Sequence, residues 1–220
     1  MRWGLATMGA KTWMLVYADA NPREALVRRP PLDRDATSRL VHDLYPSEKL
    51  TIIGDGDLSY TCPPDSEIHA GWFPGVAVVA AKEFGIDYPS KLPQRFLAAG
   101  RSGTVSLHAM HSVVDWFAYA QWVNGSLVRS LSLSPDSGVL EDIGARLPFE
   151  EPYWSGQHPA VDADEDDYPF PFHPLELGEA ALAQLFGYQL EGTVDAGLLE
   201  PETIPLVRYK RSRSWWRLFG

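Results

Sequence analysis

Cysteine is almost absent from this chain of 220 residues, which contains only Cys62. A single thiol excludes an intrachain disulfide, and it cannot supply the several cysteine ligands of a structural zinc site. We therefore predict a cytoplasmic protein and interpret Cys62 as a reduced bystander rather than a nucleophile. No cofactor is predicted, since the sequence also lacks a P-loop, a Rossmann glycine pattern and a Gly-x-Ser-x-Gly elbow.

Long apolar runs are also missing. The nearest candidate, residues 70–81, is interrupted by glycine and proline, whereas a transmembrane helix needs about 18 uncharged apolar residues. Residues 1–20 imitate a secretory signal, but Lys11 interrupts them and their apolar patch is shorter than the roughly seven residues that such a signal requires. We therefore expect a soluble protein in which this patch is the first buried strand.

Basic residues are scarce in one third of the chain. Residues 135–202 contain 16 acidic residues and a single basic one, Arg146. By contrast, residues 1–134 contain 13 residues of each sign, and residues 203–220 contain five basic and no acidic residues. An acidic surface repels phosphate backbones, so we do not expect nucleic acid as a partner.

What the chain does contain is apolar and aromatic residues, at 45% and 12% of the total, which is enough for a large core. The nearly continuous apolar run over 12–17 predicts a strand that is buried on both faces and central in a sheet. Asn124-Gly125 lies between two aromatic and β-branched runs and predicts a hairpin over 116–134. Alternating serines in its second strand predict one core face and one wet face.

Together these patterns predict an α+β fold with a mainly antiparallel or mixed β-sheet and two or three short helices. Helices are expected over three segments: 33–44, 93–100 and 175–186. A second hairpin is expected over 67–81, and a strand over 50–53 should end at a turn formed by residues 54–57. We expect one globular domain over residues 1–190, followed by a C-terminal extension over residues 191–220.

Five segments resemble an uncharacterised family of actinobacterial proteins, which is a domain of unknown function. The segments are MGAKTWMLVYA (8–18), HAMHSVVDWFAYA (108–120), SLSLSPDSG (130–138), LPFEEPYW (147–154) and PFHPLELGEAA (171–181). The resemblance covers about residues 8–190 and implies a bacterial cytoplasmic protein, with Met8 as an alternative start. The family carries no assigned activity, so the resemblance assigns no catalytic residue.

His108, His111 and Asp115 are residue types that ligate metals or act as acids and bases. On a helix they would share one face. The segment leads into a predicted hairpin, however, and the period of two in a strand sends His108 and His111 to opposite faces. We therefore favour buried, hydrogen-bonded histidines, with a metal site at His108 and His111 as the weaker alternative.

Glu150 and Glu151 are the best candidates for paired carboxylates. Acid/base hydrolysis requires two carboxylates in unlike environments on either side of a bond, and adjacent residues rarely converge on one bond. A further carboxylate such as Asp115 would be needed. The enzyme hypothesis is therefore a metal-assisted or carboxylate-dependent hydrolase with His111, Asp115, Glu150 and Glu151 as candidate catalytic residues.

Our leading hypothesis is a noncatalytic binding or regulatory module. A surface rich in tryptophan and proline around 147–174, with Tyr153 and Trp154, would recognise another protein. The basic and aromatic residues over 208–219 form a second candidate surface, whose contact residues would be Arg211, Arg213, Trp215 and Trp216. This tail suits a partner protein, the chain's own acidic segment or an anionic membrane surface. The last would place the protein peripherally at the inner membrane face.

Overall fold

A nine-stranded antiparallel sheet organises the chain. The computed structural model describes residues 10–100, 103–160, 168–192 and 195–213, without the side chain of residue 213. The strands are β1 (Lys11–Ala18), β2 (Glu48–Asp57), β3 (Glu67–Phe73), β4 (Val76–Ala80), β5 (Thr104–His111), β6 (Trp116–Val123), β7 (Ser126–Ser134), β8 (Gly138–Ile143) and β9 (Pro205–Arg213). Their order in the sheet is β2-β9-β3-β4-β1-β5-β6-β7-β8, and all neighbouring strands are antiparallel.

The helices are short and lie between the strands in the sequence. In the described part of the chain they are α1 (Pro22–Val27), α2 (Arg34–Leu44), α3 (Gln94–Ala98), α4 (Glu151–Trp154) and α5 (Pro174–Phe186), with 3-10 turns η1 (Lys82–Phe84), η2 (Pro89–Lys91) and η3 (Pro201–Thr203). The predicted α+β class is confirmed in outline, although there are five α-helices instead of two or three. Among the described residues, no helix is long and apolar enough to cross a membrane.

Strand β1 is the fifth of the nine strands and is buried on both faces, which confirms its prediction. Its side chains alternate between two cores. Trp13, Leu15 and Tyr17 belong to the core on one face, and Met14 and Val16 to the core on the other. Because both faces of a central strand must be removed from water, the sheet needs a covering layer on each side.

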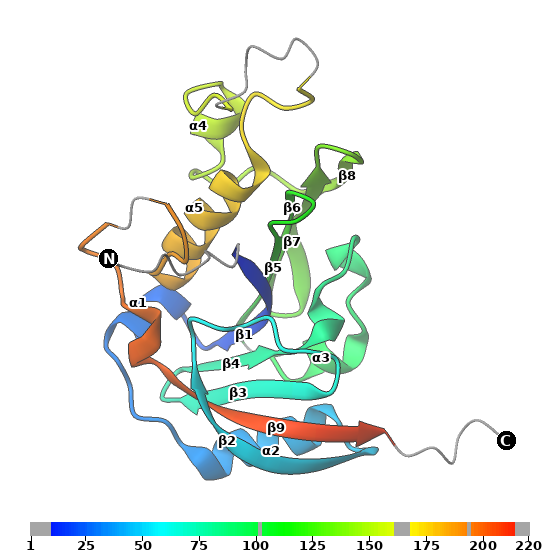
Figure 1. Cartoon of the computed structure of the whole chain (residues 1–220), viewed down its shortest axis with the longest axis vertical. Helices are drawn as coiled ribbons and strands as arrows, with labels where there is room; N and C mark the ends of the chain where they lie inside the picture. The colour runs from blue at the N-terminus through cyan, green and yellow to red at the C-terminus, as the bar shows by residue number, and fades with distance from the viewer. Residues whose placement is uncertain (1–9, 101–102, 161–167, 193–194, 214–220) are drawn as a thin grey trace, which may run out of the picture.

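The two covering layers come from different parts of the sequence. One core contains residues of α2, η1 and α3, and the other contains residues of α1, α5 and the segment that follows α5. The second face continues across β6 and β7, where it packs against α5 and the segment around α4. Figure 1 shows α5 and α2 on opposite sides of the strongly twisted sheet, in which β6 and β7 run across the direction of β3 and β9.

Local sequence signals explain the two longest helices. Asp33 precedes α2, and its side chain accepts a hydrogen bond from the Ala36 backbone N–H at 2.8 Å. Helix α5 ends at Gly187, whose φ of 84° is a left-handed conformation that favours glycine. Both helices, the short α3 and the hairpin of β3 and β4 lie where the sequence predicts them.

The Asn-Gly hairpin is confirmed, but its predicted wet face is wrong. Asn124 and Gly125 have φ values of 49° and 80° between β6 and β7. Ser130 and Ser132, on the supposed wet face, are fully buried. The segment that contains η2 packs over this face, and Trp116 Nε1 donates to Ser132 Oγ at 3.1 Å. The serines therefore serve as buried hydrogen-bonding groups.

The turn predicted after the second strand is corrected. Residues 54–57 do not form a turn, because β2 continues through them with a register irregularity between Ile52 and Gly54.

Part of the predicted C-terminal extension from residue 191 forms a strand. Residues 205–213 form β9, which lies between β2 and β3 inside the sheet. Strand β9 pairs with both of them along the backbone.

Replacing Asp33 with alanine tests the cap of α2. The variant loses an acceptor for an otherwise unpaired N–H, so we expect the free energy of unfolding to fall by about 1 kcal/mol in urea titrations. Asp35→Ala is the matched control, because Asp35 is also exposed and lies in the first turn but is not the cap. Equal losses in the two variants would contradict the capping role.

Candidate functional site

His108 is a buried structural histidine. Its Nε2 lies 3.0 Å from the Gly178 carbonyl oxygen, and its Nδ1 lies 2.7 Å from Thr12 Oγ1. A carbonyl only accepts, so Nε2 carries the proton and the neutral ring accepts from the Thr12 hydroxyl. Burial lowers the pKa of His108 to about 4, and the ring therefore links β1, β5 and α5 in its uncharged form. This is the hydrogen-bonded histidine that the sequence favours.

His111 and Asp115 do not meet at one site. His111 lies on the opposite face of β5 from His108, and its ring is 5.6 Å from the ring of Trp13. Asp115 lies in the turn after β5 with a φ of 45°, and its Oδ2 is 3.8 Å from His173 Nε2. In the described part of the chain, no group of three or more His, Cys, Asp or Glu side chains could hold a metal ion.

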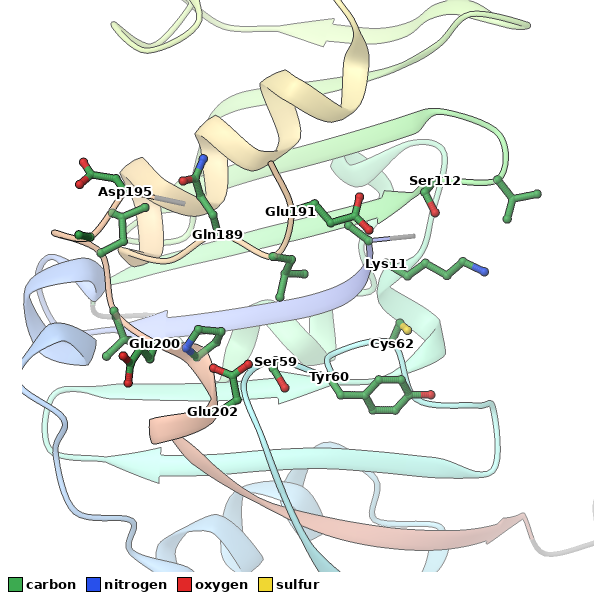
Figure 2. Close-up of a pocket in the computed structure, with 17 residues that line it drawn as sticks. Lys11, Ser59, Tyr60, Cys62, Ser112, Gln189, Glu191, Asp195, Glu200 and Glu202 are labelled. Carbon is green, nitrogen blue, oxygen red and sulfur yellow. The ribbon is translucent and has the colours of Figure 1, made fainter. Parts of the chain in front are cut away.

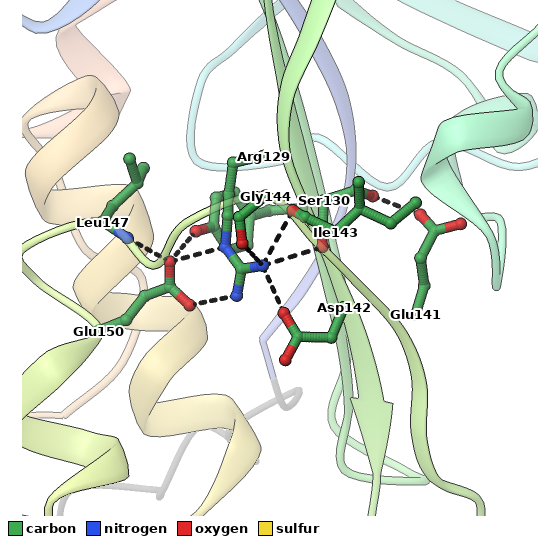
Figure 3. Close-up of polar contacts among 9 residues, drawn as sticks. Arg129, Ser130, Glu141, Asp142, Ile143, Gly144, Leu147 and Glu150 are labelled. Carbon is green, nitrogen blue, oxygen red and sulfur yellow. Dashed lines mark hydrogen bonds and ion pairs between the residues drawn. The ribbon is translucent and has the colours of Figure 1, made fainter.

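Glu150 is the acceptor of a fully buried ion pair. Arg129 donates to it through Nε at 2.9 Å and Nη2 at 2.6 Å, and both side chains have no exposed surface. The Tyr119 hydroxyl and the Leu147 backbone N–H donate to the same carboxylate at 2.5 and 2.7 Å. Figure 3 shows Arg129 and Leu147 on two sides of the Glu150 carboxylate. Because its carboxylate accepts four hydrogen bonds from the protein, Glu150 has a structural role. Its neighbour Glu151 is exposed in α4.

Arg129 also joins this carboxylate to the edge of the sheet. Its Nη1 donates to Asp142 Oδ1 at 2.5 Å and to the Ile143 carbonyl oxygen at 3.0 Å, both in β8. We call Arg129, Glu150, Tyr119 and Asp142 the Arg129 network. It ties β6, β7 and β8 to the segment before α4. The predicted hydrolase residues are therefore not brought together: Glu150 contacts this network, and His111 and Asp115 have other neighbours.

The predicted tail contact Arg211 is also buried. Its guanidinium pairs with Glu83 through Nη1 and with Asp65 through Nη2 at 2.9 Å, and Nε lies 3.7 Å from Glu48. Arg211 is 4% exposed, so it serves the chain's own fold and is unavailable as a surface contact. Residue 213 contributes its backbone to β9. The side chain of residue 213 is not described, and Trp215 and Trp216 lie outside the described residues.

Tyr153 and Trp154 pack inward only in part. Both are half-buried on the core formed by β6, β7 and α5. The centres of the Trp154 and Phe172 rings lie 4.9 Å apart in an edge-on arrangement. The Arg146 guanidinium lies over the Trp154 ring, with Cζ 4.2 Å from the ring centre. Recognition of another protein by Tyr153 and Trp154, or of a membrane by the tail, stays a prediction.

A cleft of about 860 Å³ opens at the start of β1, away from most of the predicted site residues. Its lining comes from the start of β1 with the turn after β5, from the loop after β2, and from residues 189–191, 195–196 and 198–202. A smaller hollow of about 350 Å³ adjoins it and shares Lys11, Tyr60 and Cys62 with it. Figure 2 shows these three residues at one end of the cleft and Asp195, Glu200 and Glu202 toward the other.

Backbone contacts position the walls of this cleft. Trp13 N–H donates to the Thr61 carbonyl oxygen at 2.8 Å, which docks the loop carrying Tyr60 and Cys62 against β1. On the opposite wall, Glu179 of α5 accepts from the Leu190 N–H at 2.8 Å. The walls are thus attached to the central strand on one side and to α5 on the other.

Two lysines affect the ionisable groups where the cleft and the hollow meet. Burial raises the pKa of the Cys62 thiol, an effect that Lys11, the Tyr60 hydroxyl and Lys82 partly offset. Burial, Lys11 and Lys82 all lower the pKa of His111, which lines the hollow. Sequence reasoning missed Lys11 and Lys82. The available signal was a lysine at the start of β1 and another two residues after the end of β4.

The fold and this cleft define an α+β protein with a two-sided antiparallel sheet and an open pocket at its central strand. A family model described as "Family of unknown function (DUF6928)" matches residues 12–209. The chain belongs to this family. The match extends past residue 190 into β9, in agreement with the place of that strand in the sheet. No curated protein and no solved structure matches the chain.

Substitution of Glu150 and its neighbour tests the Arg129 network. Glu150→Gln removes the fully buried countercharge of Arg129 and leaves the more exposed Asp142 as its charged partner, so we expect a loss of about 3 kcal/mol in the free energy of unfolding. Glu151→Gln should change it by less than about 0.5 kcal/mol, because Glu151 is exposed. Urea titrations of both variants measure the difference. A loss below about 1 kcal/mol for Glu150→Gln would contradict the role of this ion pair.

Glu179 predicts a pH dependence for the wall of the cleft. Burial raises the pKa of its carboxyl from 4.5 to about 7. The folded state therefore favours the protonated form, and the stability that this provides is lost as the pH rises from 4.5 through about 7. The loss should reach about 3 kcal/mol.

The variant Glu179→Gln removes this titration but keeps an acceptor for the Leu190 N–H. We expect it to gain stability relative to the wild type between pH 5 and about pH 8, measured by urea unfolding at each pH. Glu176→Gln, an exposed position in the first turn of the same helix, is the control. Parallel pH profiles for wild type and Glu179→Gln would overturn the assignment.

Proposed function

We propose that the protein is a noncatalytic binding module whose recognition site is the cleft at the start of β1. The cleft carries this proposal: its volume of about 860 Å³ lies within the range of roughly 300–1,000 Å³ that small-molecule sites occupy. Its lining combines apolar groups such as Leu199 with charged groups of both signs. This composition suits orientation of a polar small molecule.

The engagement of the acid/base candidates supports binding over hydrolysis. Glu150 accepts four hydrogen bonds in the Arg129 network, and His108 is held between Thr12 and Gly178. Neither lines the cleft. A hydrolase would need an acid and a base within reach of one substrate bond, and the cleft brings together neither the predicted pair nor the predicted metal ligands.

The opposed charges of the cleft suggest the kind of ligand. Lys11 lies at one end with Glu191 on the same side of the view, and Asp195, Glu200 and Glu202 lie toward the other end (Figure 2). Complementary charge mainly sets orientation and specificity. We infer a small molecule with an anionic group at one end and amino or hydroxyl groups at the other.

A cleft-filling variant tests the site. Ala196 is exposed and lines the cleft, so Ala196→Trp places an indole in the ligand's space without burying it in the core. Thermal unfolding is followed with a panel of amino acids, dipeptides, nucleotides and sugar phosphates. A ligand at one hundred times its Kd adds about 2.7 kcal/mol to stability, which corresponds to a rise of several degrees in Tm.

We expect at least one compound of the panel to raise the Tm of the wild type and to lose this effect in Ala196→Trp. Ala145→Trp is the matched control, because Ala145 is also exposed but lies beside β8, outside the cleft. Failure of the whole panel, or an equal shift in Ala196→Trp, would overturn the cleft as the binding site.

A further inference from the structure

The small hollow beside the cleft gathers positively charged and aromatic side chains. Lys11 opens β1 and lies opposite His111 of β5 in the register of the sheet. Lys82 follows β4, and its Nζ lies 4.2 Å from the centre of the Trp13 ring. Trp13, Lys11, Lys82 and His111 all line the hollow, together with Tyr60. Strand β1 and the 3-10 turn η1, which follows β4, therefore bring both lysines to the lining of the same hollow.

The two lysines have no carboxylate partner in the described part of the chain. No ion pair within 4.0 Å involves either of them there. Asp65 also borders the hollow, but its Oδ1 accepts from Arg211 Nη2 at 2.9 Å. The positive charge of the two lysines acts on the His111 ring, because both lysines contribute to lowering its pKa. The lining therefore carries two ammonium groups against one carboxylate, that of Asp65, and an anion in the hollow would offset the remaining positive charge.

The chemistry of the donors points to one anion class. The lining contains lysines and no arginine. Arginine forks bind carboxylate and phosphate alike, whereas a lysine ammonium acts as a point charge with three donors. Two such point charges suit the nearly double negative charge and the several oxygens of a phosphate group better than the single charge of a carboxylate. The Tyr60 hydroxyl and the His111 ring provide further hydrogen-bonding groups on the same lining.

We propose that this hollow binds a phosphate group, with the rest of a phosphorylated small molecule lying in the adjoining cleft. The inference rests on the proposed binding function, since the phosphate would anchor one end of the ligand. Lys11 and Lys82 are the anchoring residues. Lys11, Tyr60 and Cys62 form the border across which the ligand passes from the hollow to the cleft.

Cys62 offers a direct probe of the charge in the hollow. It is the only cysteine of the chain and lines both spaces. Its reaction rate is measured with two methanethiosulfonates of similar size, an anionic sulfonatoethyl and a cationic trimethylammonioethyl reagent. The ratio of the two rates cancels the thiolate fraction, because both reagents attack the same thiolate.

We expect the ratio of anionic to cationic reagent rates to exceed that of free cysteine roughly tenfold at low salt and to fall as salt is added. Lys11→Gln and Lys82→Gln should each reduce the ratio severalfold. Arg28→Gln removes one exposed positive charge on α1 and should leave it unchanged. A ratio equal to that of free cysteine, or one that neither lysine variant alters, overturns the proposal.

Binding is then measured by protection of Cys62 from uncharged iodoacetamide. The probes are inorganic phosphate, phenyl phosphate, acetate and glycerol. Saturable protection by the first two, weakened at least fivefold in Lys82→Gln, supports a phosphate site. Stronger protection by phenyl phosphate than by inorganic phosphate identifies an esterified ligand, and the reverse identifies free phosphate.

The two proposals fail separately. Absence of protection by either phosphate probe overturns the phosphate site, even where the sulfonate preference is found. In that case the Ala196→Trp comparison still decides, independently, whether the cleft is a binding site. In the converse result, the phosphate probes protect Cys62 while every Tm shift of the wild type is equally large in Ala196→Trp. That result retains the phosphate site and removes the cleft as the place of the larger ligand.

Discussion

The burial of β1 on both faces is the constraint on which the rest of the structure depends. This strand sends Trp13 and Leu15 into one core and Met14 and Val16 into the other. Each large apolar side chain contributes about 1.5–3 kcal/mol only if water is removed from it, so the sheet is stable only between two layers. Helices α2 and α3 supply one layer, and α1 and α5 supply the other. The cleft lies where β1 begins and these coverings end.

A second constraint acts at the far side of the sheet, where a charge is buried instead of an apolar group. Arg129 occupies a strand position that faces the core with Leu131 and Leu133. A buried guanidinium requires a paired carboxylate and full hydrogen bonding. Glu150 meets this requirement, and the Arg129 network thereby fixes the segment before α4 on the sheet. Glu150, which the sequence offered as a candidate catalytic carboxylate, thus has a structural role in the fold.

Signals within a few residues of one another were sufficient for much of the fold. Asp33 capping, Gly187 termination and the Asn124-Gly125 turn each depend on local backbone chemistry, and the elements that they bound are correct. The prediction of a wet face on β7 was wrong because alternation alone cannot tell whether another segment covers the serines. The pairing of β9 could not be predicted, because its partners β2 and β3 lie more than 100 residues earlier in the chain.

By itself, the sequence determined the α+β class, the central place of β1, the opposite orientations of His108 and His111, and the membership in a family without assigned function. Only the tertiary structure decided which charges meet. It paired Arg129 with Glu150 and Arg211 with Glu83, and it brought Lys82 beside Trp13 in the hollow next to the cleft. The physical reason is that electrostatic interactions depend on distance and burial in space, and neither quantity can be read from separation along the chain.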